Sequence, residues 1–184
     1  MAGQFSKPRT SILLAIVHFF IELSLLQRKP QDLPASPVLL ALMLGVGLLG
    51  GVLLSITAGA NLWASIGQKS LDLLLMLGAL HLGLKLTGKL PRFLQTATAL
   101  VGADTLIGIL LLVPVGLAGP NASDSEQLVL AGLMIIALLA WSVAIGAHIL
   151  RNAFDIKLIQ GAIIVVVFYS LSFLLVGGLT QGAS

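Results

Sequence analysis

The sequence predicts an all-α integral membrane protein, in which five transmembrane helices follow an N-terminal amphipathic helix that lies in the membrane interface. Three observations support this fold class. Hydrophobic residues make up 58% of the 184 residues and charged residues only 9%, whereas a soluble domain has roughly 25% charged residues. The mean hydropathy is +1.08. Five segments reach or approach the about 20 residues that a helix needs to cross the hydrocarbon core of a bilayer.

The same composition excludes several classes of protein. The chain has 10 Lys and Arg and 7 Asp and Glu, too few to cover the surface of a soluble enzyme or a nucleic-acid-binding domain. Because no cysteine is present, disulfides, thiol catalysis and cysteine-ligated metals are excluded as well. We expect the lipid bilayer as a partner, no nucleic acid and no cofactor.

The N-terminal region, residues 1–36, is predicted to be cytoplasmic and to contain an interfacial helix over about residues 11–26. This segment is short for a span, and basic residues flank it on both sides. Its weakly polar stripe consists of Ser11, Ala15, His18 and Glu22. Such a pattern is typical of a helix lying along a membrane surface, with Phe19 and Phe20 facing the acyl chains. A sixth, thin span is the alternative.

A proline-rich elbow follows this helix and leads into the transmembrane domain, residues 37–184. Pro30 and Pro34 prevent helix formation in the elbow. Pro37 suits the first turn of the next helix, and Ser36 suits its N-cap. The predicted spans are, in order, residues 37–59, 70–86, 93–117, 128–150 and 158–179.

The placement of basic residues favours five spans over six. With five spans, nine of the ten Lys and Arg residues lie on one side of the membrane, and only Lys69 lies on the other. With six spans, Lys7 and Arg9 change sides and the separation becomes weaker. Since cytoplasmic loops are enriched in Lys and Arg, the N-terminus is predicted to be cytoplasmic. The C-terminus and the loop containing Asp124 are then outside.

Asp104 is the residue whose burial in a membrane is most costly. It lies 12 residues after Arg92, which corresponds to about 18 Å along a helix and places it near the middle of the bilayer. Trp141 and Tyr169 lie at similar depths in later spans, and both can donate hydrogen bonds. We therefore predict a polar cluster of Asp104, Trp141 and Tyr169, acting as a structural clasp or as a site for a proton or solute. Asp72, beside Lys69, is interpreted as a helix cap.

Small residues recur every four positions on the first span. They are Gly47, Gly51, Ser55 and Gly59. Because small side chains let helices approach closely in a membrane, this face is predicted to pack against another helix. That helix belongs either to the same chain or to a partner.

The histidines give little indication of a metal site or of catalysis. His81 and His148 lie near cytoplasmic helix ends, where a histidine is usually a satisfied polar residue. His18 and Glu22 have the spacing of two metal ligands but lack a recognised motif. No catalytic motif is present, so we expect neither an enzyme nor a metal site.

Two stretches resemble the Yip family of Rab-interacting membrane proteins. They are LDLLLMLGALHLGLKLTGKLPRFLQTATALVGADTLIGILLLVP and LAWSVAIGAHILRNAF. The first is similar to the family's second and third spans, with a basic link and a late proline, and the second is similar to its fourth span. The Asp-Leu-Tyr-Gly-Pro motif of eukaryotic members is missing. The chain therefore resembles the small bacterial branch, and Rab binding is not implied.

Two functions are consistent with these features. The Yip-like layout and the small-residue face imply a non-enzymatic scaffold or assembly factor of the bacterial inner membrane, with a membrane-protein partner or as a homo-oligomer. The alternative is a small channel or a proton or solute carrier centred on Asp104, which requires a cavity that reaches this residue.

Overall fold

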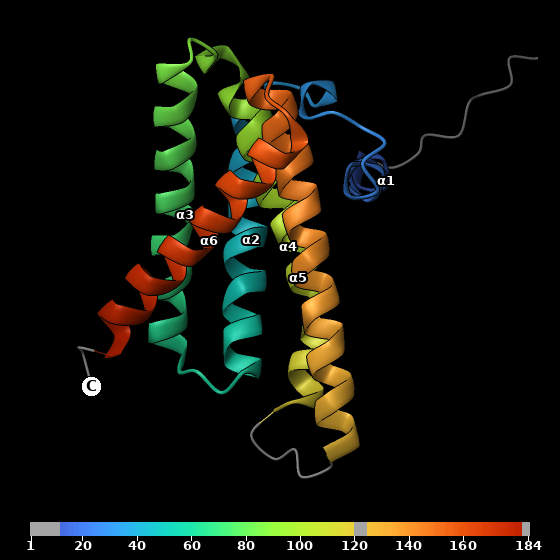
Figure 1. The fold of residues 1–184 in the computed structure, drawn as a ribbon, viewed down its shortest axis with the longest axis vertical. Helices are drawn as coiled ribbons and strands as arrows, with labels where there is room; N and C mark the ends of the chain where they lie inside the picture. The colour runs from blue at the N-terminus through green and yellow to red at the C-terminus, as the bar shows by residue number, and fades with distance from the viewer. Residues whose placement is uncertain (1–11, 120–124, 182–184) are drawn as a thin grey trace, which may run out of the picture.

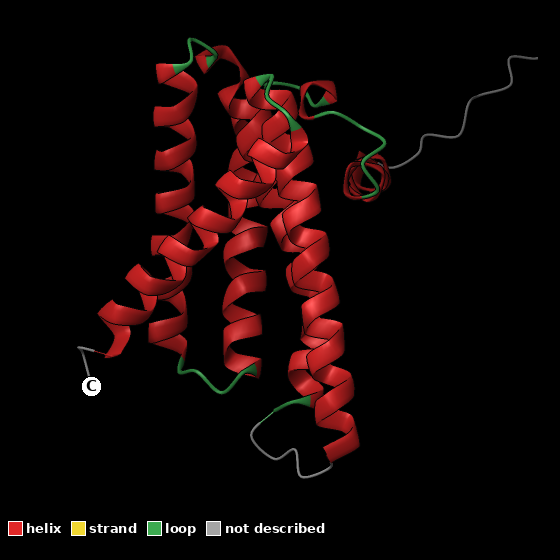
Figure 2. Cartoon of the chain, viewed as in Figure 1, coloured by secondary structure: helices red, strands yellow, loops and turns green. Residues whose placement is uncertain are grey.

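The computed structural model describes residues 12–119 and 125–181, and this part of the chain is a helical bundle with no β-strand (Figures 1 and 2). The bundle contains five long helices, α2 (Pro37–Thr57), α3 (Leu62–Leu86), α4 (Phe93–Leu117), α5 (Ser125–Phe154) and α6 (Leu158–Gln181). A shorter helix, α1 (Ile12–Ser24), precedes them. Two 3₁₀ turns, η1 (Pro30–Asp32) and η2 (Leu90–Arg92), precede α2 and α4. The all-α fold class is confirmed.

Four segments of the described chain are long and apolar enough to cross a membrane. They are Pro37–Thr57, Leu90–Leu117, Ser125–Phe154 and Leu158–Leu175. Helix α3 does not belong to this group, although it is 25 residues long and contacts α2, α4 and α6. It differs from the others because it carries Lys69, Asp72 and Lys85. A helix with several charges is thus part of an otherwise apolar bundle.

Helix α3 begins at Leu62, well before the predicted start at Ser70. The side chain of Asn61 caps it by accepting a hydrogen bond of 2.8 Å from the backbone N–H of Ala64. The prediction placed the helix start after Lys69 because a charge marks the end of most membrane spans. Here Lys69 is two helical turns inside α3, so Asp72 is not at an N-terminus and does not cap the helix.

The end of the elbow has the predicted local structure, whereas Pro30 opens a short 3₁₀ turn instead of preventing helix formation. Ser36 is the N-cap of α2 and accepts a hydrogen bond from the N–H of Leu39, and Pro37 occupies the first helical position. Gln31 in η1 donates to the carbonyl oxygen of Asn152 in α5 at 2.6 Å. Gln95 of α4 donates to the carbonyl oxygens of Gln31 and Leu33. These bonds fix the elbow to α4 and α5.

Helix α1 lies across the bundle, so Figure 1 shows it end-on while α2 to α5 run along the long axis. Its inner face buries Phe20 and Leu23, whereas Leu14 and Val17 are exposed on its outer face. Phe20 packs so closely over Gly102 of α4 that a Cβ atom there would lie 2.0 Å from the ring. The expectation that Phe20 faces the acyl chains is therefore wrong. The ring fills a notch that exists because residue 102 has no side chain.

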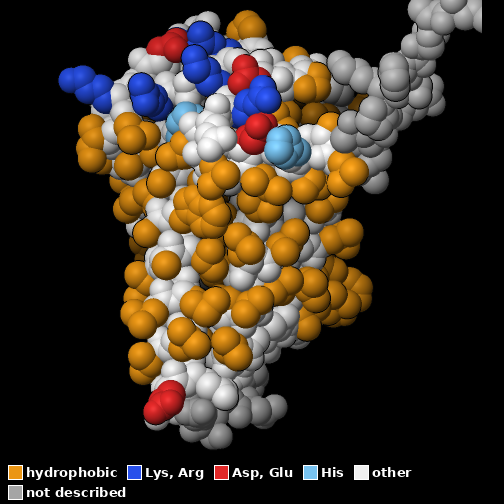
Figure 3. Space-filling model, turned by 90° about the vertical axis from the view of Figure 1, so that its right-hand side faces the viewer, with side chains coloured by type: hydrophobic (Ala, Val, Ile, Leu, Met, Phe, Trp, Pro, Cys, Tyr) orange, Lys and Arg blue, Asp and Glu red, His pale blue; other side chains and the backbone are white. Residues whose placement is uncertain are grey.

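The surface divides into bands along the long axis. Figure 3 shows hydrophobic side chains covering the middle of the visible face, with Lys, Arg, His and acidic side chains at one end and an acidic side chain at the other. The α3–α4 and α5–α6 connections lie at this charged end (Figure 1). A band of apolar surface between polar ends is the pattern expected of a protein surrounded by acyl chains. Lys7, Arg9 and Asp124, which entered the topology prediction, lie outside the described residues.

Candidate functional site

An ion pair joins α3 and α4 in the middle of the bundle. The Nζ atom of Lys69 lies 2.8 Å from Oδ2 of Asp104. Asp104 is 11 residues, or about 16 Å, from the start of α4. The backbone of Lys69 lies nearer the opposite end of the bundle, and its side chain extends inward to Asp104. Asp104, the carboxylate whose burial in a membrane costs most free energy, therefore has a cationic partner.

The same lysine binds a second carboxylate. Its Nζ atom lies 3.1 Å from Oδ2 of Asp72, one turn further along α3. The other oxygen of Asp72 accepts a hydrogen bond of 2.7 Å from the hydroxyl group of Ser172 in α6. Lys69, Asp72 and Asp104, which we call the charge triad, thus connect α3, α4 and α6. With all three groups ionised, one positive and two negative charges give the triad a net charge of −1.

Glycines of α2 make room for the triad. A Cβ atom on Gly51 would lie 2.6 to 2.8 Å from three carbons of the Lys69 side chain, and one on Gly47 would lie 3.0 Å from Val101 and Thr105 of α4. Ser55 donates back to the carbonyl oxygen of Gly51, and Gly59 adopts φ +94° just after the end of α2. The predicted small-residue face therefore packs inside this chain at Gly47 and Gly51.

A cavity of about 610 Å³ borders the triad on one side. Its polar wall includes Lys69, Asp104, Thr105 and Tyr169, and the rest is mainly glycine and aliphatic surface from α2, α4, α5 and α6. The side chain of Asp104 is 40% exposed and that of Lys69 only 15%. Asp104 is consequently the charged group that a molecule in the cavity would meet first. The volume falls within the range of about 300–1,000 Å³ that is common for small-molecule sites.

The structure brings two of the three predicted cluster residues to this cavity. Tyr169 and Asp104 both line it, together with Ser142 of α5. Trp141 does not join them. Its indole N–H donates to the carbonyl oxygen of Ser24 at 3.0 Å, so it binds one of the free carbonyls at the end of α1. Neighbouring residues on a helix point about 100° apart, which turns Ser142 toward the cavity and Trp141 toward α1.

The histidines occupy structural positions. The ring of His81 meets that of Phe93 edge to face, with centroids 5.3 Å apart. Nε2 of His148 lies 2.9 Å from the carbonyl oxygen of Arg28, which links α5 to the elbow. His18 pairs with Glu22 at 3.3 Å on α1. Among the described residues, no group of three or more His, Asp or Glu side chains is placed to hold a metal ion.

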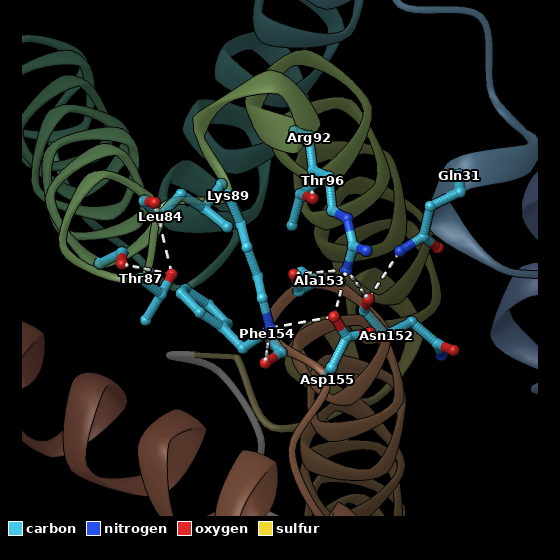
Figure 4. Close-up of polar contacts among 11 residues, drawn as sticks. Gln31, Leu84, Thr87, Lys89, Arg92, Thr96, Asn152, Ala153, Phe154 and Asp155 are labelled. Atoms are coloured by element: carbon cyan, nitrogen blue, oxygen red, sulfur yellow. Dashed lines mark hydrogen bonds and ion pairs between the residues drawn. The ribbon is translucent and has the colours of Figure 1, made fainter.

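A second polar cluster closes the charged end of the bundle (Figure 4). Arg92 donates from Nη1 to the carbonyl oxygens of Asn152 and Ala153, both at 3.1 Å, and Lys89 donates to that of Phe154. Both cations also bind Asp155 at 2.9 Å. These carbonyls end α5 and have no partner within the helix. This cluster, which we call the terminal clamp, therefore caps the end of α5 with side chains from the connection between α3 and α4. We assign it a structural role.

Sequence reasoning missed Lys69 as a member of the site. The spacing of Lys69 and Asp72, three residues apart on one helix face, is a signal for such a pair. The glycine at position 51 is a second signal, because a long side chain inside a bundle needs space. Ser172 could not have been identified, since its distance from Asp72 depends on how α6 crosses α3.

No family model matches the chain, and neither the curated proteins nor the solved structures contain a match. The long apolar helices support the prediction that the chain is a membrane protein. The resemblance to the Yip family remains a prediction.

Proposed function

We propose that the protein is a small membrane carrier whose binding site is the cavity beside Lys69 and Asp104. The observation that carries this proposal is a charged pair at the wall of a cavity of about 610 Å³ within an apolar bundle. The carrier hypothesis requires a cavity that reaches Asp104, and a purely structural clasp does not. The proposed role involves binding and translocation and needs no catalytic step.

The charges of the triad also favour a binding site over a clasp. A clasp would be neutral, since a charge in the middle of a bilayer costs at least about 2.5–3.5 kcal/mol. The triad has two carboxylates for one ammonium group, and the side chain of Asp104, which lines the cavity, is 40% exposed. The remaining negative charge is stabilised when a proton or a cationic group binds.

The scaffold role implied by the resemblance to the Yip family remains a second proposal, with a membrane-protein partner or a second copy of the chain. The sequence features behind it are the absence of catalytic motifs, the Yip-like layout and the small-residue face of α2. Because Gly47 and Gly51 of this face contact α4 and Lys69, the feature supports packing within the chain rather than a partner interface. Co-purification of a stoichiometric membrane protein from native membranes would support the scaffold role.

The orientation in the membrane follows from the charged end. Lys89 and Arg92 of the terminal clamp lie at that end, and basic residues favour the cytoplasm. We propose that this end is cytoplasmic, that the C-terminus lies outside, and that the membrane is a bacterial inner membrane.

Cysteine accessibility tests the carrier proposal, because the natural chain has no cysteine. Ser170 lines the cavity and Ser65 is fully buried. Each hydroxyl group donates to the carbonyl oxygen four residues earlier, so the two serines form a matched pair. We expect Ser170→Cys in membrane vesicles to react with a membrane-impermeant methanethiosulfonate reagent applied from either side. We expect Ser65→Cys to remain unmodified.

Modification of Ser170→Cys from both sides would show that water reaches the cavity from each side of the membrane, as a carrier requires. Modification from one side only would overturn the carrier proposal and leave a one-sided binding pocket. Absence of modification, with the thiol reactive after unfolding in SDS, would identify the triad as a structural clasp.

A further inference from the structure

We propose that the ligand of this cavity is an amphiphilic amine, with one positively charged head group and an apolar tail, and that it reaches the site from within the bilayer. This inference rests on the proposed binding function of the cavity and specifies the chemical class of its ligand. It is carried by the charge balance of the triad, the two-part lining of the cavity and the position of its opening.

The charge balance favours a cationic head group. Both oxygens of Asp72 are engaged, one by Lys69 and one by Ser172. Asp104 accepts from Lys69 through Oδ2, and within the described residues its other oxygen has no hydrogen-bond donor. An ammonium group in the cavity can donate to this carboxylate in a charge-assisted hydrogen bond and brings the net charge of the triad to zero. A phosphate or carboxylate head group would instead increase the negative charge.

The remaining lining is suited to an apolar tail. Ile107 and Leu111 of α4, Leu139 of α5 and Leu174 of α6 border the same cavity. Glycines of α2 and α4 complete the wall without filling the space. A small hydrophilic cation would leave this surface without an apolar partner. A molecule with a head and a tail matches both parts of the lining.

The opening of the cavity lies in the apolar band of the protein. Helices α5 and α6 cross closely where Gly161 meets the backbone of Ala147 and Gly146 meets Val165. Beyond this crossing, α6 leans away from α5 toward α3 (Figure 1). Phe173 and Leu174, which border the cavity on α6, are 78% and 68% exposed. Exposed apolar side chains at this level face acyl chains, so the opening admits molecules that dissolve in the bilayer.

The test uses the single tyrosine of the chain, which lies at the cavity. Labelling with ¹³C-tyrosine gives one aromatic reporter, Tyr169, for NMR of the full-length protein in nanodiscs of phosphatidylcholine. We expect dodecylamine to shift its resonances saturably. Dodecanol and dodecanoate have the same chain length but carry a neutral and an anionic head, and we expect neither to cause a saturable shift.

Two variants locate the binding site. Asp104→Asn removes the charge that meets the head group and should weaken dodecylamine binding by at least about ten-fold. Leu139→Trp leaves all charges in place at a position that is 48% exposed and should weaken binding by filling the space for the tail. Glu126→Gln, a carboxylate replaced in the first turn of α5, is the matched control and should bind as the natural chain does.

The outcomes separate the ligand class from the carrier role. A saturable shift with dodecanoate or dodecanol equal to that with dodecylamine would overturn the cationic head group. If Asp104→Asn and Leu139→Trp both bind dodecylamine as strongly as the natural chain does, the amine lies outside the cavity and the inference is overturned. If Ser170→Cys is reached from both sides while dodecylamine causes no saturable shift, the carrier proposal stands and the amine class is wrong.

Discussion

At the scale of single residues, the site depends on a glycine and a lysine that fit each other. Gly51 leaves the space through which the Lys69 side chain passes to reach Asp104. The aliphatic part of a lysine can lie along apolar surface while its ammonium group lies several ångströms away. Counting residues from a boundary locates a Cα atom but not the end of such a side chain. Counting residues therefore predicts the depth of Asp104 but does not show that Lys69 reaches it.

Removing the lysine should destabilise the bundle. Lys69→Met leaves two carboxylates close together without their shared cation. Breaking a fully buried pair costs about 3–5 kcal/mol, and the partial exposure of Asp72 and Asp104 reduces the expected loss to about 1–3 kcal/mol. The free energy of unfolding, measured by SDS titration in mixed micelles, tests this. The double variant Lys69→Met/Asp104→Asn should recover part of the loss, and strictly additive losses would show that the pair is not coupled.

Asp155 in the terminal clamp should make stability depend on pH. Hydrogen bonds from Lys89 and Arg92 lower the pKa of its carboxyl group below the ordinary value. A lowered folded-state pKa contributes stability above the unfolded-state pKa of about 3.9, and this stability is lost as the pH falls through the folded-state pKa. We expect Asp155→Asn to unfold at a lower temperature than the natural chain at pH 6. The difference should shrink as the pH falls below about 4.

The choice of asparagine keeps the backbone of this position comparable. Asp155 has φ +52°, a left-handed conformation that Asn and Asp adopt more readily than other side chains. Asp155→Asn therefore removes the charge without adding strain. A difference in melting temperature that stays constant between pH 3 and pH 6 would contradict the role assigned to the carboxylate.

At the scale of helices, most boundaries could be predicted and the errors have clear causes. The range of α4 agrees with the prediction, and α2, α5 and α6 contain their predicted spans to within a few residues, because long apolar runs define them. The predicted start of α3 was wrong because Lys69 lies inside the helix and pairs with Asp104, a carboxylate far away in the sequence. The predicted contacts of Trp141 and Phe20 were wrong because both residues contact or belong to α1, whose position the sequence does not give.

The docking of α1 can be tested at its closest contact. Gly102→Ala places a methyl group where the Phe20 ring lies, so the ring must move out of its notch and α1 should loosen from α4. Gly108→Ala on the same helix meets nothing within 4 Å and serves as the control. In a Trp63→Phe background, the remaining indole, Trp141, reports the change because it binds the end of α1. We expect a red shift of its fluorescence for Gly102→Ala and none for the control.

If the emission of Trp141 is unchanged in Gly102→Ala, the indole has kept its environment and the notch does not hold α1 in place. A shift of the same size in Gly108→Ala would show that any added methyl group on α4 disturbs the indole.

At the scale of the whole molecule, the contacts that hold the helices together are unevenly distributed along the bundle. Near the charged end, the terminal clamp, the elbow and the close crossing of α5 and α6 hold the helices together. Toward the other end, α6 departs from α5 and the cavity lies between them. The sequence predicted the polar ends and the apolar band, since both follow from the order of charged residues and apolar runs along the chain. The uneven distribution of these contacts depends on segments that are distant in the sequence, and hydrophobic periodicity does not reveal which of them meet.

The close crossing at Gly161 gives α6 the geometry of a lever with its fulcrum near one end. Twenty residues of helix extend from Gly161 to Gln181, an arm of about 30 Å. A rotation of roughly 5° about the crossing moves the far end by about 2.6 Å over such an arm, while the residues at the fulcrum hardly move. Tyr169 and Ser172 lie part-way along this arm. Small rotations of this one helix therefore change both the width of the cavity and the distance between Ser172 and Asp72.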